Sequence, residues 1–353
     1  MPRNAGRTLL VTGSHWYEGS RCRSAVENLL TGISYARIAC ASGEPTTDSI
    51  ELVRKQVQEF SPELIIGIGG GSVLDTAKAL SGLLALPGSV EHYLEGSGDT
   101  RPIEHGGIPW VAVPTTAGTG AEATKNSVIR SSAQGAKRSM RSRFLLAYSA
   151  IVDPELTRDL PRDATGISGL DALTQLVEAY VSKKSNPAVQ ALVSSAFLPH
   201  LDALKLLADD PRDEAARSDA AYGALVSGIA LANAGLGAAH GFAGGIGGSC
   251  GIPHGLICAV FLPHVLAYNA EVIREGIRAL VGTRCGKQDP VEWLSAECSG
   301  LLRAYGLPAD LKVFGVPGEK MDEISRASEG SSMSGNPRGL DEDVKRQFLS
   351  ALL

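Results

Sequence analysis

The chain has 353 residues, a formal net charge of −5 and 44% hydrophobic residues. This length favours two domains, and the weak negative charge gives no indication of a nucleic-acid or membrane partner. The six cysteines form no C-x-x-C pair and the N-terminus is polar, so we expect a cytoplasmic protein with reduced thiols and no signal peptide.

Strands and helices alternate over the first part of the chain. Apolar runs predict buried strands over residues 7–13, 34–41, 64–68 and 110–113, and the last strands are expected at Val128 and over 145–152. Between them, apolar residues at helical spacing cover 20–30, 47–59 and 72–86. This alternation predicts an α/β domain with a mostly parallel sheet.

From Leu160 onward the pattern becomes helical. Alanine- and leucine-rich segments with a helical period cover residues 165–183, 187–207, 213–234, 254–280 and 290–305. We find no convincing strand there, and no apolar run approaches the length that a transmembrane helix needs. Two prolines in the polar segment 153–163 mark the boundary, so we predict an α/β domain over residues 1–158 and an all-α domain over 159–353.

A glycine-rich turn, Gly67-Ile-Gly-Gly-Gly-Ser72, follows one predicted strand and precedes a predicted helix. Glycine lets the backbone approach a pyrophosphate closely, and the start of the helix offers free N–H groups and a partial positive charge. Gly70, Gly71 and Ser72 are therefore candidate phosphate ligands. We expect Ser72 and Asp75 to form a capping box, and Asp75 is also a candidate cofactor-binding residue. The alternative is a plain strand-to-helix connection, because a glycine cluster alone is weakly specific.

A second polar turn, Pro114-Thr-Thr-Ala-Gly-Thr-Gly120, follows the next predicted strand. The hydroxyl groups of Thr115, Thr116 and Thr119 are placed to contact a ribose or a phosphate. An ordinary loop rich in serine and threonine explains the same residues equally well.

Asp171, His240 and His254 form a candidate metal-ligand set. Asp171 lies in an otherwise apolar stretch, where a carboxylate is costly unless it is paired or binds a metal. Gln175, four residues later, shares its helix face, and we expect it to point at the metal or at a water bound to it. The two histidines flank a glycine-rich stretch that we interpret as a loop, and His264 is expected to be structural. One carboxylate and two imidazoles suit a catalytic divalent metal with an open position; a helix cap and satisfied core histidines are the alternatives.

Six motifs occur in the order found in the iron-containing (group III) alcohol dehydrogenases. They are Gly69-Gly-Gly-Ser72, Pro114-Thr-Thr-Ala-Gly-Thr119, Val152-Asp-Pro-Glu-Leu156, Gly169-Leu-Asp-Ala-Leu173, Pro253-His-Gly255 and Asn336-Pro-Arg338. The chain resembles this family over essentially its whole length. The resemblance implies a dehydroquinate synthase-like fold, with an NAD(P)-binding α/β domain over 1–158 and a helical metal- and substrate-binding domain over 159–353.

The resemblance also implies functional residues. Metal ligands fall on Asp171, His240 and His254, but iron-binding members have histidine where this chain has Gln175, and many have another where it has Gly244. An amide oxygen binds Fe²⁺ or Zn²⁺ more weakly than imidazole does, so both metals, and a metal-free form, stay open. Cofactor contacts fall on Gly70, Gly71, Ser72, Thr115, Thr116, Thr119, Asn126, Lys137 and Leu156.

The resemblance leaves the choice of nicotinamide cofactor open. Members that prefer NAD often carry an aspartate after the second strand, close to the adenosine ribose. The equivalent residues here, Ala39-Cys40-Ala41, include no carboxylate that would repel a 2′-phosphate. Both NAD and NADP are therefore expected cofactors.

We predict a cytoplasmic, homodimeric, metal-assisted NAD(P)-dependent alcohol dehydrogenase or aldehyde reductase. Its substrate is a small alcohol or aldehyde, and an anionic one is left open. The metal held by Asp171, His240 and His254 would bind the substrate oxygen as a Lewis acid, while the nicotinamide exchanges hydride.

Two alternatives are retained from other classes. One is a dehydroquinate synthase-like lyase with NAD and zinc, for which Lys125, Lys137, Arg138 and Arg141 supply basic groups. The other is a non-catalytic NAD(P)-binding protein. Metal analysis and a cofactor-oxidation assay with aldehydes distinguish all three.

Overall fold

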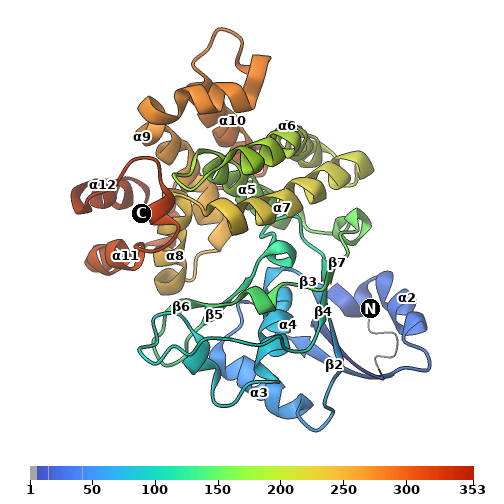
Figure 1. Cartoon of the computed structure of the whole chain (residues 1–353). Helices are drawn as coiled ribbons and strands as arrows, with labels where there is room; N and C mark the ends of the chain where they lie inside the picture. The colour runs from blue at the N-terminus through green and yellow to red at the C-terminus, as the bar shows by residue number, and fades with distance from the viewer. Residues whose placement is uncertain (1–5, 15, 42) are drawn as a thin grey trace. The chain divides into compact units, whose positions relative to one another are not determined.

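The structure is a computed structural model that describes residues 6–14, 16–41 and 43–353, so the N-terminal residues behind the signal-peptide expectation lie outside the described residues. The chain divides into two compact units (Figure 1). We call Met1–Thr116 with Ala121–Leu156 the sheet unit, and Ala117–Gly120 with Thr157–Leu353 the helical unit.

The sheet unit holds all strands of the described residues. They are β1 (Arg7–Gly13), β2 (Ser34–Cys40), β3 (Leu64–Gly69), β4 (Trp110–Pro114), β5 (Asn126–Arg130), β6 (Lys137–Arg141) and β7 (Ser149–Ala150), with helices α1 (Trp16–Gly19), α2 (Cys22–Leu29), α3 (Thr47–Val57) and α4 (Gly71–Leu83). The helical unit holds α5 (Arg162–Val181), α6 (Pro187–Asp209), α7 (Glu214–Ala234), α8 (Ala238–Cys250), α9 (His254–Val281), α10 (Pro290–Ala304), α11 (Met321–Ala327) and α12 (Glu342–Leu352).

Five strands form a parallel sheet in the order β2-β1-β3-β4-β7, which confirms the predicted α/β class. In β1, Leu9 belongs to the core that contains α3 and α4, whereas Leu10 packs with Tyr17 of α1 in a second core. Successive side chains of a strand point to opposite faces, so helices cover the sheet on both sides. Gly69 of β3 pairs with Pro114 of β4, so the turns that follow these strands begin side by side.

The end of the sheet unit differs from the expectation. Only Ser149–Ala150 of the predicted strand over 145–152 joins the sheet, because Leu145 ends a 3₁₀ helix, Arg143–Leu145, and is buried in the core. Val128 lies in β5, which pairs antiparallel with β6 as a separate two-stranded sheet. The sequence pattern does not predict this hairpin, whose connection includes Gly135 at a φ of +66°.

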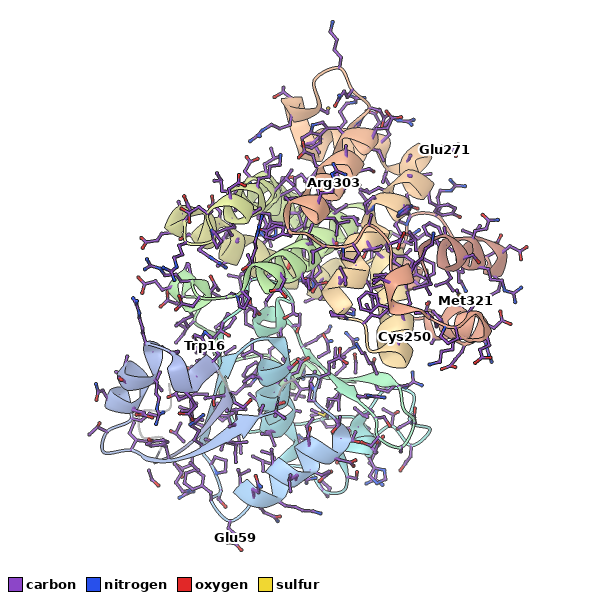
Figure 2. The ribbon with its side chains drawn as sticks, turned by 180° about the vertical axis from the view of Figure 1, so that it is seen from behind. Trp16, Glu59, Cys250, Glu271, Arg303 and Met321 are labelled. Carbon is purple, nitrogen blue, oxygen red and sulfur yellow. The ribbon has the colours of Figure 1, made fainter. Side chains whose placement is uncertain are left out.

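The central helix of the helical unit is α5, in which every residue from Gly169 to Tyr180 is buried. It packs against α6, α7 and α9, and the predicted helices of this region are all present. The two C-terminal helices α11 and α12 escape the sequence analysis. Figure 2 shows that Met321 of α11 lies close to Cys250 at the end of α8.

The interpretation of residues 241–253 as a loop is wrong, because most of them form helix α8. Glycine is a poor helix former, but two of these glycines are required by packing. A Cβ on Gly245 would lie 2.5 Å from the Ser328 hydroxyl oxygen and 2.7 Å from the Ile324 carbonyl oxygen of α11. A Cβ on Gly241 would lie 2.8 Å from a side-chain carbon of Met333. The glycines thus let α8 approach α11 and the loop after it.

The expectation that no apolar run approaches the length of a membrane span also needs correction. The helical segments Pro187–Asp209 and His254–Cys285 are long and apolar enough by length and composition. Their most apolar windows are 50% and 61% buried inside the structure. Residues such as Phe197 and Phe261 of these segments belong to the helical core, so part of this apolar surface is packed inside the helical unit.

We predict that Gly245→Ala destabilises the helical unit by about 1–3 kcal/mol, because the added methyl group meets α11 backbone. The matched control is Gly244→Ala in the same helix, where a Cβ has nothing within 4 Å. That control should leave stability unchanged or raise it by roughly 0.5–1 kcal/mol. Urea unfolding followed by circular dichroism measures both, and equal midpoints for the two variants would contradict the packing argument.

Candidate active site

Helix α5 places three polar side chains in one buried stripe. Asp171, Gln175 and Glu178 follow at helical spacing, and each side chain is almost completely buried. The Gln175 amide nitrogen donates to Asp171 Oδ2 at 3.3 Å and to the Thr119 carbonyl oxygen at 3.4 Å. Its oxygen accepts the Ser227 hydroxyl at 2.7 Å. Gln175 therefore holds one oxygen of Asp171 and is itself held from α7.

The start of α8 is organised by Glu178. This carboxylate accepts the backbone N–H groups of Gly237 at 3.0 Å and Ala239 at 2.7 Å, and it lies 2.7 Å from His240 Nδ1. A carboxylate at a helix N-terminus satisfies free N–H groups and interacts favourably with the helix dipole. Because Nδ1 is committed to Glu178, Nε2 is the ring atom of His240 that faces Asp171, 3.3 Å from Oδ1.

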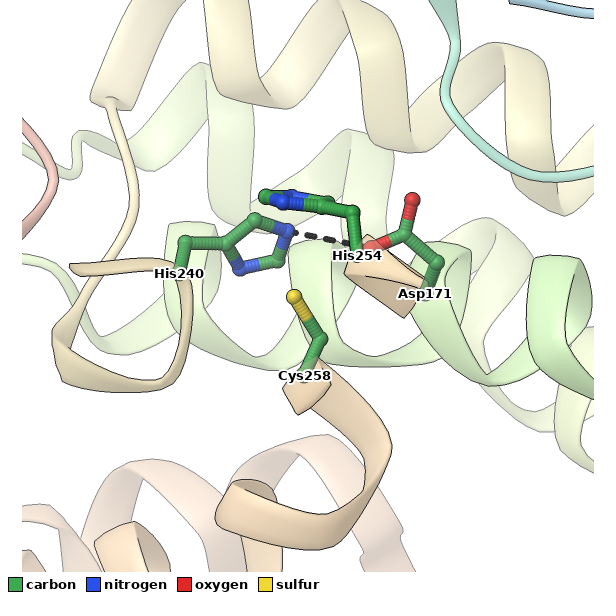
Figure 3. Close-up of side chains that lie close together, drawn as sticks. All are labelled: Asp171, His240, His254 and Cys258. Carbon is green, nitrogen blue, oxygen red and sulfur yellow. Dashed lines mark ion pairs between the residues drawn. The ribbon is translucent and has the colours of Figure 1, made fainter. Parts of the chain in front are cut away.

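Helix α9 supplies two more donor side chains. His254 is its first residue and Cys258 follows one turn later, so both side chains lie on one face. The helix can start here because residue 255 is glycine. A Cβ at this position would lie 2.6 Å from the Ile167 carbonyl oxygen of α5. Figure 3 shows the imidazoles of His240 and His254, the Asp171 carboxylate and the Cys258 sulfur gathered at one point.

These four side chains form a compact donor cluster. One donor atom from each of Asp171, His240, His254 and Cys258 lies within 4.8 Å of the others. The rings of His240 and His254 are 5.5 Å apart between centroids. The structure thus brings together the three sequence-predicted ligands and adds a thiol that the sequence analysis does not name.

Burial and mutual charge shift the ionisation of the cluster. Burial alone would raise the pKa of Asp171, but His240 and His254 beside it hold that pKa below its ordinary value. Burial alone would lower the pKa of His240, yet contacts with Cys258, Asp171 and Glu178 raise it well above its ordinary value. Burial raises the pKa of the Cys258 thiol to about 12. These pKa shifts favour the charged forms of Asp171 and His240 despite their burial, and the neutral form of the Cys258 thiol.

Two buried atoms of the cluster lack hydrogen bonds within the described part of the chain. They are Asp171 Oδ1 and His240 Nε2. These two atoms lie 3.3 Å apart, but the geometry between them is not that of a hydrogen bond. Buried polar atoms are rarely left in this state, since each costs about 1–3 kcal/mol. An oxygen and an imidazole nitrogen aimed at one point are the donors that a divalent cation binds, so these residues fit a metal.

The glycine turn of the sheet unit carries the predicted phosphate-binding residues. Gly70 is the N-cap of α4 and, being glycine, supplies no side-chain cap to this helix start. A Cβ on Gly69 would lie 2.6 Å from Val73, and one on Gly70 would meet Thr116 at 3.3 Å. The turn is therefore compact, with Gly71 and Ser72 as the first helical residues and partly exposed. Its free N–H groups fit a phosphate.

The threonine turn is divided between the two units. The Thr115 backbone N–H donates to the Gly69 carbonyl oxygen at 3.0 Å, and Thr116 lies against Gly70, so both threonines accompany the glycine turn. Thr119 instead belongs to the helical unit, where its carbonyl oxygen accepts from Gln175.

The capping box expected between Ser72 and Asp75 is wrong. The Asp75 carboxylate accepts the Val128 backbone N–H at 3.1 Å and lies 3.5 Å from the Lys78 ammonium, so it is turned toward β5. Lys78 is fully buried and donates to Asn126 O at 2.7 Å, to Ala121 O at 2.8 Å and to Thr124 Oγ1 at 2.9 Å. This buried cation fixes the chain between β4 and β5, a role that the sequence does not reveal.

Three further predicted cofactor residues lie outside the glycine turn. The Asn126 carbonyl oxygen accepts from Lys78, and Lys137 forms an ion pair with Glu44. Leu156 lies in a 3₁₀ helix, Pro154–Thr157, where its N–H donates to Asp153. None of the described hydrogen bonds joins Lys137 or Leu156 to the glycine turn.

Glu178, Cys258 and Lys78 are the residues that sequence reasoning misses. Glu178 carried a usable signal, because it is a carboxylate seven residues after Asp171 in the same apolar helix. Lys78 carried a similar signal, since it interrupts the apolar run of α4. Cys258 carried none, because cysteine is ordinary in a buried apolar helix.

Comparison with known proteins places this arrangement in one family. The model of the family described as iron-containing alcohol dehydrogenase matches residues 2–154, and the model of its C-terminal domain matches residues 165–353. Long-chain-alcohol dehydrogenase 1 of Geobacillus thermodenitrificans is 34% identical, over 80% of this chain and 72% of its own length. Sulfoacetaldehyde reductase of Bilophila wadsworthia is 32% identical, over 92% and 86%. A crystal structure of 1,3-propanediol oxidoreductase superposes with a TM-score of 0.91 at 27% identity, covering 99% of this chain and 93% of that one.

The chain belongs to the iron-containing alcohol dehydrogenase family. It is accordingly a metal- and NAD-dependent oxidoreductase that acts on CH–OH groups and interconverts alcohols and aldehydes. The predicted fold class and enzyme class are confirmed.

We predict that Lys78→Met destabilises the sheet unit by about 2–4 kcal/mol, because the largely buried Asp75 carboxylate loses its cation and two backbone carbonyl oxygens lose their donor. The double variant Lys78→Met with Asp75→Asn should recover part of this loss, since no unpaired charge remains. Denaturant unfolding of Lys78→Met, of Asp75→Asn and of the double variant gives the coupling energy between the two residues. Strictly additive effects would show that the buried pair does not act as a unit.

Proposed function

We propose that Asp171, His240 and His254 hold the divalent metal of this oxidoreductase and form its catalytic centre. The observation that carries the proposal is the pair of buried atoms without hydrogen bonds, Asp171 Oδ1 and His240 Nε2, at the point where His254 joins them. The donor set matches catalytic sites that use three protein ligands and keep an open position.

A metal held by Asp171, His240 and His254 would supply a Lewis acid for the substrate oxygen, and a bound nicotinamide would supply the hydride chemistry. The protein groups around it have positioning roles. Glu178 accepts from His240 Nδ1 and so presents Nε2, while Gln175 holds Asp171 Oδ2 and leaves Oδ1 free. Partners of this kind fix the orientation of metal ligands. We assign Gln175 to this role, because its oxygen is engaged by Ser227.

The glycine turn is our proposed pyrophosphate site, with Gly70, Gly71 and Ser72 at the start of α4 and Thr115 and Thr116 beside it. Support comes from the uncapped helix start, whose N–H groups and dipole favour an anion. For Thr119, Asn126, Lys137 and Leu156 the cofactor assignment rests on the family pattern alone.

We propose that the enzyme accepts NADP as well as NAD. Strand β2 ends at Cys40, and the first carboxylate after it, Glu44, is paired with Lys137. No unpaired carboxylate among residues 34–41 and 43–44 would repel a 2′-phosphate. Titration with NADH and NADPH decides the preference.

The substrate is proposed to be a small alcohol or aldehyde, with anionic aldehydes included. The names of two relatives point to substrates as different as long-chain alcohols and sulfoacetaldehyde, so membership of the family does not fix the substrate. All six cysteines are free thiols, which supports a reducing, cytoplasmic location. An aldehyde panel that includes sulfonated and carboxylated members tests the substrate range.

We predict that His254→Ala lowers metal affinity by more than about 100-fold and turnover with it, because losing a ligand exceeds the 10–100-fold cost of losing an outer partner. The matched control is His264→Ala on the same helix, an exposed histidine outside the cluster. Metal content after dialysis and aldehyde-dependent NADH oxidation measure both variants. Full metal occupancy in His254→Ala would remove His254 from the ligand set.

We predict that Ser72→Glu weakens NADH binding by at least about tenfold, because a carboxylate at the start of α4 competes with the cofactor's phosphates. Ser72→Ala removes the hydroxyl without adding charge and should retain most of the affinity. Fluorescence titration with NADH gives both dissociation constants. If Ser72→Glu binds NADH as tightly as the wild type, the turn is a structural connection only.

A further inference from the structure

Cys258 is a fourth donor at the proposed metal centre. Its side chain is fully buried, and its sulfur points toward the ring of His240 (Figure 3). It sits one helical turn after His254, so the two side chains share the face of α9 that is turned to Asp171. A buried cysteine normally packs as a small apolar residue, but this one lies among two imidazoles and a carboxylate.

The amide on the same stripe of α5 is occupied elsewhere. Gln175 donates to Asp171 Oδ2 and accepts from Ser227 at 2.7 Å, so a metal would have to break the second contact to reach its oxygen. Gly244, one turn after His240, is exposed and carries no donor. Among the described residues, Cys258 is therefore the remaining side chain that places a donor atom beside Asp171, His240 and His254.

The spacing of the four donors suits a tetrahedral ion. Metal–ligand distances of about 2.0–2.3 Å place tetrahedral donors roughly 3.3–3.8 Å apart. The four donor atoms here lie within 4.8 Å of one another, so small side-chain movements close the set. A metal bound through this sulfur would require the Cys258 thiol to lose its proton to solvent and to bind as a thiolate.

We propose that Cys258 Sγ is a protein ligand of the metal, which makes the centre an Asp171–His240–His254–Cys258 site that selects Zn²⁺ over Fe²⁺. This inference rests on the proposed metal site and deepens it. A thiolate is a soft ligand that favours zinc, and zinc also lies above iron(II) in the general order of affinity. Four protein ligands do not exclude a substrate, since catalytic zinc can expand to five ligands.

Cobalt(II) substitution tests the sulfur ligand directly. We expect the metal-depleted full chain to take up Co²⁺ with visible d–d bands and with a thiolate-to-cobalt charge-transfer band in the near ultraviolet. Cys258→Ser should lose the charge-transfer band and keep d–d bands. The control, Cys298→Ser, removes another fully buried thiol outside the cluster and should keep both.

The spectra distinguish failure of this inference from failure of the proposed function. Wild-type d–d bands without a charge-transfer band, or a band that survives in Cys258→Ser, would overturn the sulfur ligand and leave the three-ligand site standing. Absence of any Co²⁺ bands in the wild type would overturn the metal site itself. Should Cys258→Ser fail to fold, X-ray absorption of the zinc-loaded wild type decides, because a sulfur ligand appears at about 2.3 Å.

Metal competition tests the selectivity. We expect Zn²⁺ affinity to fall by at least about 100-fold in Cys258→Ser, while Fe²⁺ affinity falls less. A loss of this size exceeds the roughly 10–100-fold loss that is typical when a residue that only holds a metal ligand is removed. The measurement is equilibrium binding under anaerobic conditions, with Cys298→Ser as the control. Equal losses for the two metals would refute selection by sulfur.

Discussion

The buried carboxylate of Glu178 determines both the position of α8 and the orientation of His240. It satisfies two backbone N–H groups where α8 begins and holds the imidazole of His240 through Nδ1. The helix dipole stabilises the carboxylate, and the carboxylate stabilises the helix start, so neither element is well placed without the other. The direction of His240 Nε2 thus follows from how Glu178 caps α8. The geometry of the donor cluster therefore depends on the hydrogen bonds between Glu178 and the backbone at the start of α8.

The sheet unit uses a buried charge of the opposite sign in a similar way. Lys78 gathers two backbone carbonyl oxygens and the Thr124 hydroxyl around one ammonium group, with Asp75 as its counter-ion. Burial lowers the pKa of Lys78, although Asp75 partly opposes that effect. In both units an irregular stretch of chain is ordered by one ionised side chain that projects from a regular helix.

The fold was largely predictable because the apolar periodicity of the first half and the alanine-rich helices of the second are strong local signals. Asp171 was recognisable because a charge stands out in an apolar helix. The failures were contacts between distant residues. Helix α8 reads as a loop because the need for glycine at 245 comes from α11, about eighty positions later. The orientation of the Asp75 side chain could not be predicted, because its hydrogen-bond partner lies in the unpredicted strand β5. Nothing in the sequence distinguishes Cys258 from other buried cysteines.

The segment Ala117–Gly120 carries a consequence for the order of folding. Gly120 has a φ of +61°, and a Cβ there would lie 2.4 Å from the Gly228 Cα of α7, while one on Gly118 would meet Ser168 of α5 at 2.7 Å. These close contacts of Gly118 and Gly120 cannot form until α5 and α7 have formed. Chains emerge from the ribosome N-terminus first, so the connection between β4 and β5 must wait, incompletely packed, until α7 has been synthesised. The segment Ala117–Gly120 therefore completes its packing only after the chain has been synthesised as far as Gly228, although the strands on either side of it belong to the sheet unit.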